Sequence, residues 1–154
     1  MHPKDYSFII KGIPLAVRED AVVLIRTPEQ MYKLCEDLAT LPQECLVVIC
    51  LNSKGFVIDR HAVTIGLMDS CLIHPREVFR CAIYDNAAVI VLCHNHPSGD
   101  YCPSAEDIRV TKKLIEAGKI VDIKVLDHVI IGKKKTENDK GFLSMRESGL
   151  CEFN

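Results

Sequence analysis

Residues 87–107 constrain the fold of this chain more than any other stretch. The apolar run 87–93, Ala-Ala-Val-Ile-Val-Leu-Cys, is typical of a strand that is buried on both faces of a sheet. His94 and His96 follow it, and because alternate side chains of an extended backbone point the same way, both imidazoles can face one point. A loop containing Pro and Gly then leads to Ser104, which begins a helical pattern with Asp107 in its first turn. The stretch therefore predicts a sheet edge at which two histidines and a carboxylate meet.

Two imidazoles and one carboxylate form a ligand set that suits Zn²⁺ and leaves a fourth position for water. Each part alone has an ordinary explanation, since a buried histidine is commonly a core residue and Ser-x-x-Asp is a common helix N-cap. The full order of strand, His-x-His, loop and helix start favours a metal site instead. We therefore predict one Zn²⁺ bound by His94, His96 and Asp107.

The same residues resemble the JAMM (MPN-type) zinc metallopeptidase motif, His-x-His-x7-Ser-x2-Asp, which is matched in full by His94, His96, Ser104 and Asp107. The segment His-Asn-His-Pro-Ser-Gly-Asp is most similar to the RadC-like branch of this family, and segments 74–78 and 127–132 also agree with that branch. The resemblance runs from about residue 27 to residue 150. The resemblance implies an α/β fold with three α-β-α layers and a mixed central sheet, akin to cytidine deaminase. It also implies a zinc-dependent hydrolase that cleaves an amide, peptide or isopeptide bond through a metal-activated water, with the Ser104 hydroxyl donating to the tetrahedral intermediate.

Such a hydrolase also needs a general base close to the metal. The resemblance places this carboxylate on an earlier strand just before apolar residues, which fits Glu44 at the head of the apolar run 45–51. Glu77 is the alternative because it lies nearer in sequence, but in the first turn of a helix it can simply favour the positive end of the dipole. If the strand that Glu44 opens and the strand that His94 closes are antiparallel neighbours, Glu44 lies beside the histidines. We predict on this basis that Glu44 is the base.

Two other functions compete with hydrolysis. A zinc nucleobase deaminase carries His-x-Glu followed by Pro-Cys-x-x-Cys, and His96 stands where that glutamate would be. A non-enzymatic metal-binding interaction module of the DNA repair-associated RadC family is the stronger alternative. Full-length RadC-like proteins carry a helix-hairpin-helix region, for which this sequence has no room. The net charge of −2 gives no general attraction to phosphate backbones, so we expect weak, non-specific DNA binding at most.

The rest of the chain predicts one domain over residues 1–154, with residues 1–20 as a tail or short strand. Helix-breaking residues and apolar periodicity predict three helices. The first runs from Thr27 to Leu41, the second begins near Pro75, and the third runs from Ser104 to about Gly118. The predicted strands are 21–25, 44–51, 56–65, 87–93, 121–126 and 129–131, followed by a return at 141–145.

Cysteine use and hydropathy bear on the compartment. The eight cysteines include no Cys-x-x-Cys pair, and no signal-peptide pattern is present, so we expect reduced thiols in a cytoplasmic protein. No apolar run approaches the roughly 18–20 residues of a membrane span. His61 is expected on the surface, and Asp127 with His128 is expected either to support the metal ligands or to form a buried structural hydrogen bond.

Overall fold

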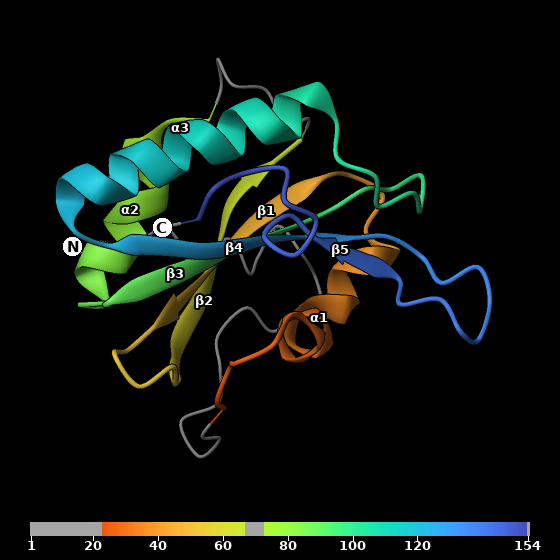
Figure 1. The fold of residues 1–154 in the computed structure, drawn as a ribbon, viewed down its shortest axis with the longest axis horizontal. Helices are drawn as coiled ribbons and strands as arrows, with labels where there is room; N and C mark the ends of the chain where they lie inside the picture. Colours follow the sequence, from red (N-terminus) through yellow and green to blue (C-terminus); the bar gives the residue numbers. More distant parts are fainter. Residues whose placement is uncertain (1–22, 67–72, 154) are drawn as a thin grey trace.

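The computed structural model describes residues 23–66 and 73–153, which form a layered α/β fold (Figure 1). In chain order the elements are α1 (Pro28–Cys35), the 3-10 helix η1 (Glu36–Thr40), β1 (Cys45–Leu51), β2 (Val57–Ile65), α2 (Pro75–Tyr84), β3 (Val89–Asn95), α3 (Ala105–Val121), β4 (Lys124–Ile131) and β5 (Phe142–Ser144). The strands of the described residues make one mixed sheet in the order β2-β1-β3-β4-β5. Only β3 and β4 pair in parallel. The predicted α/β class and mixed sheet are confirmed.

The sheet separates two apolar cores, with α1 on one face and α2 and α3 on the other (Figure 1). β1 is buried along its whole length, and its side chains alternate between the cores. Leu46 and Val48 pack on the side of α2 and α3, whereas Val47 and Ile49 pack on the side of α1. This burial on both faces is why the strand reads as a continuous apolar run.

The predicted helix at residues 27–41 begins as expected and ends early. Thr27 and Gln30 form a capping box, and Pro28 occupies the first helical position. At Glu36 the α-helix gives way to η1. At this point the buried guanidinium of Arg60 donates to the Leu34 carbonyl at 2.6 Å and also binds the carboxylate of Asp37. A contact from β2 therefore accompanies the change from α to 3-10 geometry.

The prediction of two separate strands at 121–126 and 129–131 is wrong, because the structure has one continuous strand there. α3 continues to Val121, three residues past Gly118, and a single strand, β4, follows it. The register of β4 against β3 shifts between Ile90 and Leu92, which pair with Val125 and His128, so β4 carries one extra residue. A β-bulge of this kind changes which face the following side chains point to. The bulge turns His128 toward α3.

The remaining sequence expectations have mixed outcomes. Of the predicted strand 21–25, Leu24 forms an isolated bridge with Phe56, while residues 1–22 lie outside the described residues. No helix within residues 23–66 or 73–153 is both long enough and apolar enough for a membrane span.

Candidate metal centre

Three chain segments meet at one edge of the sheet. β3 and β4 are parallel and β1 is antiparallel to β3, so the ends of β3 and β4 lie beside the start of β1. The register pairs His94 with Leu46, two residues after Glu44. This confirms the predicted antiparallel neighbours. The loop that follows His96 returns the chain to the same edge, where α3 begins and carries Asp107 in its first turn.

The predicted metal ligands come together there. The Nε2 atom of His94 lies 3.2 Å from Oδ1 of Asp107, and the Nε2 atom of His96 lies 3.1 Å from Oδ2. The two Nε2 atoms are 3.0 Å apart. His94 and Asp107 are buried, whereas the His96 side chain keeps 12% of its surface exposed. The three residues form a candidate metal-binding triad that solvent reaches from the side of His96.

The hydrogen bonds of His96 indicate which of its nitrogens carries a proton. Nδ1 lies 2.6 Å from the carbonyl oxygen of Asp100. A carbonyl can only accept a hydrogen bond, so the proton is on Nδ1. In the neutral ring, Nε2 therefore presents a lone pair to Asp107 and His94.

A longer hydrogen-bond chain decides the same question for His94. The Thr111 hydroxyl is 2.6 Å from the Asp107 carbonyl, so its one hydrogen lies in that contact. The Nδ1 atom of His128, 2.6 Å from the same hydroxyl oxygen, must then donate to it. The other nitrogen of His128 is left as the acceptor for Nδ1–H of His94, at 2.7 Å. The Nε2 atom of neutral His94 is thereby left unprotonated.

The arrangement thus directs two nitrogen lone pairs and a carboxylate at one point. Such groups repel one another at these distances unless a cation lies among them, either a proton or a metal ion that all three bind. Burial raises the pKa of Asp107, but a proton on the Nε2 atom of His94 or His96 would hydrogen-bond to the carboxylate, and this outweighs burial and holds that pKa well below its usual range. The donor set of two imidazoles and one carboxylate fits a divalent metal such as Zn²⁺.

His128 lies behind His94 and has no free ring nitrogen to offer as a fourth ligand. Both of its ring nitrogens are engaged, with His94 and with Thr111. Burial lowers its pKa well below the usual value, which keeps the ring neutral and able to accept from His94. A partner of this kind orients a metal-binding imidazole and selects its tautomer.

Ser104 and Asp107 form a capping box at the start of α3. The Ser104 hydroxyl oxygen accepts from the Asp107 backbone N–H at 3.0 Å, and Oδ2 of Asp107 accepts from the Ser104 backbone N–H at 2.8 Å. The helix cap and the candidate metal ligand are therefore the same carboxylate. Ser104 is exposed, so its hydroxyl is accessible beside the triad.

The two candidate bases occupy different environments. Glu44 is partly buried at the start of β1, and its charge is one of the causes that raise the pKa of His96 against the opposing effect of burial. Glu77 lies in the first turn of α2, where its charge acts on the pKa of the Cys81 thiol, which burial raises to about 11. Of these two carboxylates, Glu44 is therefore the one whose charge affects the pKa of a triad residue.

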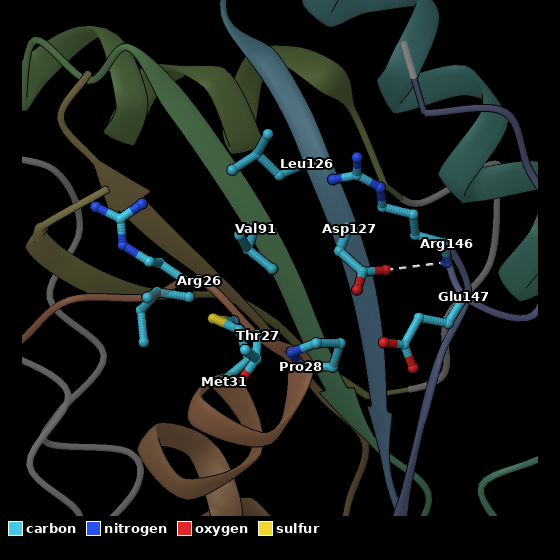
Figure 2. Close-up of a pocket in the computed structure, with 10 residues that line it drawn as sticks. Arg26, Thr27, Pro28, Met31, Val91, Leu126, Asp127, Arg146 and Glu147 are labelled. Carbon is cyan, nitrogen blue, oxygen red and sulfur yellow. Dashed lines mark hydrogen bonds between the residues drawn. The ribbon is translucent and has the colours of Figure 1, made fainter. Parts of the chain in front are cut away.

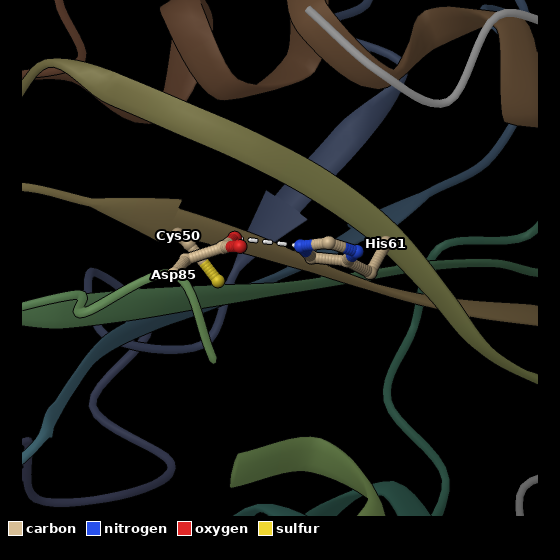
Figure 3. A group of neighbouring side chains, drawn as sticks. All are labelled: Cys50, His61 and Asp85. Atoms are coloured by element: carbon tan, nitrogen blue, oxygen red, sulfur yellow. Dashed lines mark hydrogen bonds and ion pairs between the residues drawn. The ribbon is translucent and has the colours of Figure 1, made fainter. Parts of the chain in front are cut away.

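A second group of potential ligands, Cys50, His61 and Asp85, lies between β1, β2 and the end of α2 (Figure 3). The expectation that His61 is on the surface is wrong, because its ring is only 7% exposed and its Nε2 atom lies 2.6 Å from Oδ2 of Asp85. An N–H of His61 and the thiol of Cys50 both have Asp85 as an acceptor. Each close contact in this group pairs a hydrogen-bond donor with the Asp85 carboxylate. Unlike the triad, the group therefore needs no cation to offset repulsion between its polar atoms.

A cavity of about 440 Å³ lies on the side of α1, lined by residues of β3 and β4 and of the segment after β5 (Figure 2). Asp127 faces it, and its carboxylate accepts from the Arg146 backbone at 3.1 Å and from the Ser144 hydroxyl at 2.5 Å. No residue of the triad lines this cavity. Asp127 is therefore the structural member of the Asp127–His128 pair, and His128 is the member that contacts the candidate triad through His94.

Replacing Thr111 with Val is expected to weaken Zn²⁺ binding by about 10–100-fold with the fold retained, because the tautomer of His94 is no longer imposed. Val matches the size of Thr but cannot accept the proton of His128. Competition with a chromophoric chelator measures the affinity. Thr64→Val is the matched control, since the buried Thr64 hydroxyl has no hydrogen-bond partner among the described residues. Equal affinities of the Thr111 variant and the wild type would contradict the proton positions given above.

Replacing Gly132 with Ala is expected to disturb the loop that holds His96. A Cβ atom at Gly132 would lie 2.2 Å from the Gly99 carbonyl oxygen, far inside contact distance. The loop must move, and this disturbs the hydrogen bond that His96 donates to the Asp100 carbonyl. We expect a loss of about 1–3 kcal/mol in the free energy of unfolding and weaker metal binding, measured by denaturant titration and chelator competition. Gly149→Ala has open space around the new methyl group but a left-handed φ of +71°, so it should lose stability without changing metal affinity.

Comparison with known proteins agrees with this geometry. The RadC-like JAB domain family matches residues 25–150. A UPF0758 protein of Desulforamulus reducens is 46% identical over 136 residues, which are 88% of this chain and 57% of the relative. A UPF0758 protein of Geobacillus sp. (strain WCH70) is 49% identical over 127 residues, covering 82% of this chain and 54% of the relative. The chain spans somewhat more than half the length of these relatives. The resemblance inferred from the motif is confirmed, and the chain belongs to the RadC-like JAB domain family.

Proposed function

We propose that this domain is a zinc-dependent hydrolase that cleaves an amide bond of the peptide or isopeptide type. The observation that carries the proposal is the convergence of the Nε2 atoms of His94 and His96 with the Asp107 carboxylate at an edge that solvent reaches. These three residues would hold Zn²⁺. When bound in such a site, Zn²⁺ polarises a carbonyl and lowers the pKa of a coordinated water to about 7.

Glu44 is the general base in this proposal. Its partial burial at the head of β1 and its effect on the pKa of His96 support a carboxylate that lies beside the triad without belonging to it. The carboxylate accepts a proton from the attacking water and returns it to the leaving nitrogen. It is not needed as a ligand, because His94, His96 and Asp107 already supply three.

Ser104 stabilises the developing oxyanion. Its oxygen already accepts from the Asp107 backbone N–H, so the hydroxyl hydrogen is the part that remains to donate. A donor positioned at the substrate carbonyl contributes most when charge develops on that oxygen. Fixing Ser104 at the N-cap of α3 places this donor next to the carboxylate ligand.

The test is an assay of the zinc-loaded protein on a quenched-fluorescent peptide library and on peptides joined through the ε-amine of lysine. We expect hydrolysis that a chelator abolishes and added Zn²⁺ restores. Deoxycytidine serves as the substrate of the disfavoured deaminase reaction. Zinc binding with no turnover of any substrate would favour the non-enzymatic interaction module instead.

We expect duplex DNA to bind weakly and without sequence preference. The net charge of −2 supports this, although Lys133, Lys134 and Lys135 form an exposed basic run. Titration of a fluorescent duplex over a range of salt concentrations measures the affinity, which should be low at physiological salt and should fall steeply as salt rises. Nanomolar binding to a defined duplex at that salt would contradict the expectation.

A further inference from the structure

We propose that Asn95, the residue between the two histidines, positions the general base by holding the backbone on both sides of Glu44. This inference rests on the proposed function, because Asn95 acts here only through Glu44. It gives the middle residue of the His-Asn-His segment a role that the metal-ligand pattern leaves open.

The contacts of Asn95 are directed at the residues that flank Glu44. Its side-chain oxygen accepts from the Cys45 backbone N–H at 2.7 Å, and its side-chain nitrogen donates to the Gln43 carbonyl at 3.0 Å. Asn95 has no exposed surface. The carbonyl of Glu44 itself accepts from the backbone N–H of Gly66 at 2.7 Å. Hydrogen bonds from both sides therefore hold the backbone of Glu44.

The end of the β1–β3 ladder explains why a side chain is needed at this point. Backbone pairing of the two strands begins with Leu46 and His94, so Cys45 and Gln43 lie beyond it. The backbone of β3 has meanwhile turned to β4, where His96 N–H donates to the Ile131 carbonyl. The amide of Asn95 has the same donor and acceptor groups as a peptide unit and continues the pairing by one more step.

This geometry couples the base to the metal ligands. His94 and His96 point toward Asp107, and Asn95 between them reaches across to β1. One short segment of β3 thus carries two ligands and the contact that locates the base. A general base must lie within hydrogen-bond reach of the proton it accepts, and a misplacement of about 1 Å can cost about 10²-fold in rate.

The experiment compares crystal structures of the zinc-loaded wild type, Asn95→Leu and Asn95→Ser. Leu keeps the volume of Asn without its polar groups, and Ser is a milder change in case Leu impairs folding. We expect both variants to keep His94, His96, Asp107 and one zinc in place, while the Glu44 carboxylate shifts by more than 1 Å or loses its order. Hydrogen exchange of the Cys45 amide, followed by NMR, should accelerate at least tenfold.

Asn52→Ser is the matched control, because the Asn52 side chain also accepts backbone N–H groups, from Lys54 and Phe56, at the opposite end of β1. It should leave Glu44 and the Cys45 amide unchanged. On a substrate found by the assay above, Asn95→Leu should lower kcat, and the double variant with Glu44→Gln should be no slower than Glu44→Gln alone.

The outcomes separate the two proposals. If Glu44 lies beside the zinc in the wild type and stays there in both Asn95 variants, the role of Asn95 is overturned and the proposed function stands. If the variants lose zinc, Asn95 acts on the ligands and the inference is equally overturned. If Glu44 of the zinc-loaded wild type points away from the metal, the assignment of the base and the inference fall together.

Discussion

Protein in which His94 and His96 are both replaced by alanine is expected to contain almost no zinc, whereas the wild type contains about one equivalent per chain. The double variant leaves Asp107 as the sole ligand of the triad, and a single carboxylate cannot hold Zn²⁺ against dilution. Elemental analysis of protein purified without added metal measures the content. The thermal unfolding temperature with and without Zn²⁺ gives a second measure, because a ligand that binds the folded state stabilises it.

His61→Ala is the control for this prediction. His61 belongs to the other group of potential ligands, with Cys50 and Asp85, whose hydrogen bonds are satisfied without a metal. This variant should keep its zinc and lose only stability. Full zinc occupancy in the double variant, or loss of zinc in His61→Ala, would show that the metal binds elsewhere.

Glu44→Gln is expected to leave zinc bound while the rate of hydrolysis falls by about 10²–10⁴-fold, the contribution typical of a general base. Gln retains the size of Glu and an oxygen that accepts hydrogen bonds, but it cannot take up the proton. The backbone of Glu44 is held by its neighbours' bonds to Asn95 and its own bond to Gly66, so the substitution should not move the strand. Zinc content and steady-state kinetics on the same preparation measure both effects.

Glu77→Gln is the matched control, since it makes the same chemical change in the first turn of α2. It should reduce activity little, and it removes only a favourable interaction with the helix dipole. Loss of turnover in Glu77→Gln with activity retained in Glu44→Gln would show that Glu77, and not Glu44, is the base.

Much of the framework follows from residues that are neighbours in the chain. The continuous apolarity of residues 45–51 and 89–93 required strands buried on both faces, and the structure has them as β1 and β3. The capping box of Ser104 and Asp107 started α3 where the pattern predicted. The alternation of an extended backbone brought His94 and His96 to one side. These features depend on period and on local hydrogen bonding, which act over a few residues.

Other features depended on contacts between segments far apart in the sequence. The bulge in β4 turns His128 toward His94, and a strand without that extra residue would point it to the opposite face. His61 is buried, and Asp85 at the end of α2 provides the acceptor that satisfies its ring there.

The same reason accounts for the finer organisation of the site. The tautomer of His94 depends on Thr111 and His128, which belong to α3 and β4, and the backbone on both sides of Glu44 is hydrogen-bonded to Asn95 of β3. Each of these side chains is compatible with several local structures, and its partner is chosen only when the sheet and helices assemble. The sequence alone therefore determined β1, β3, the helix cap and the pattern of candidate metal ligands. The tertiary structure decided the register, the proton positions and the residues that hold the ligands in place, because hydrogen bonds between distant segments exist only in the assembled fold.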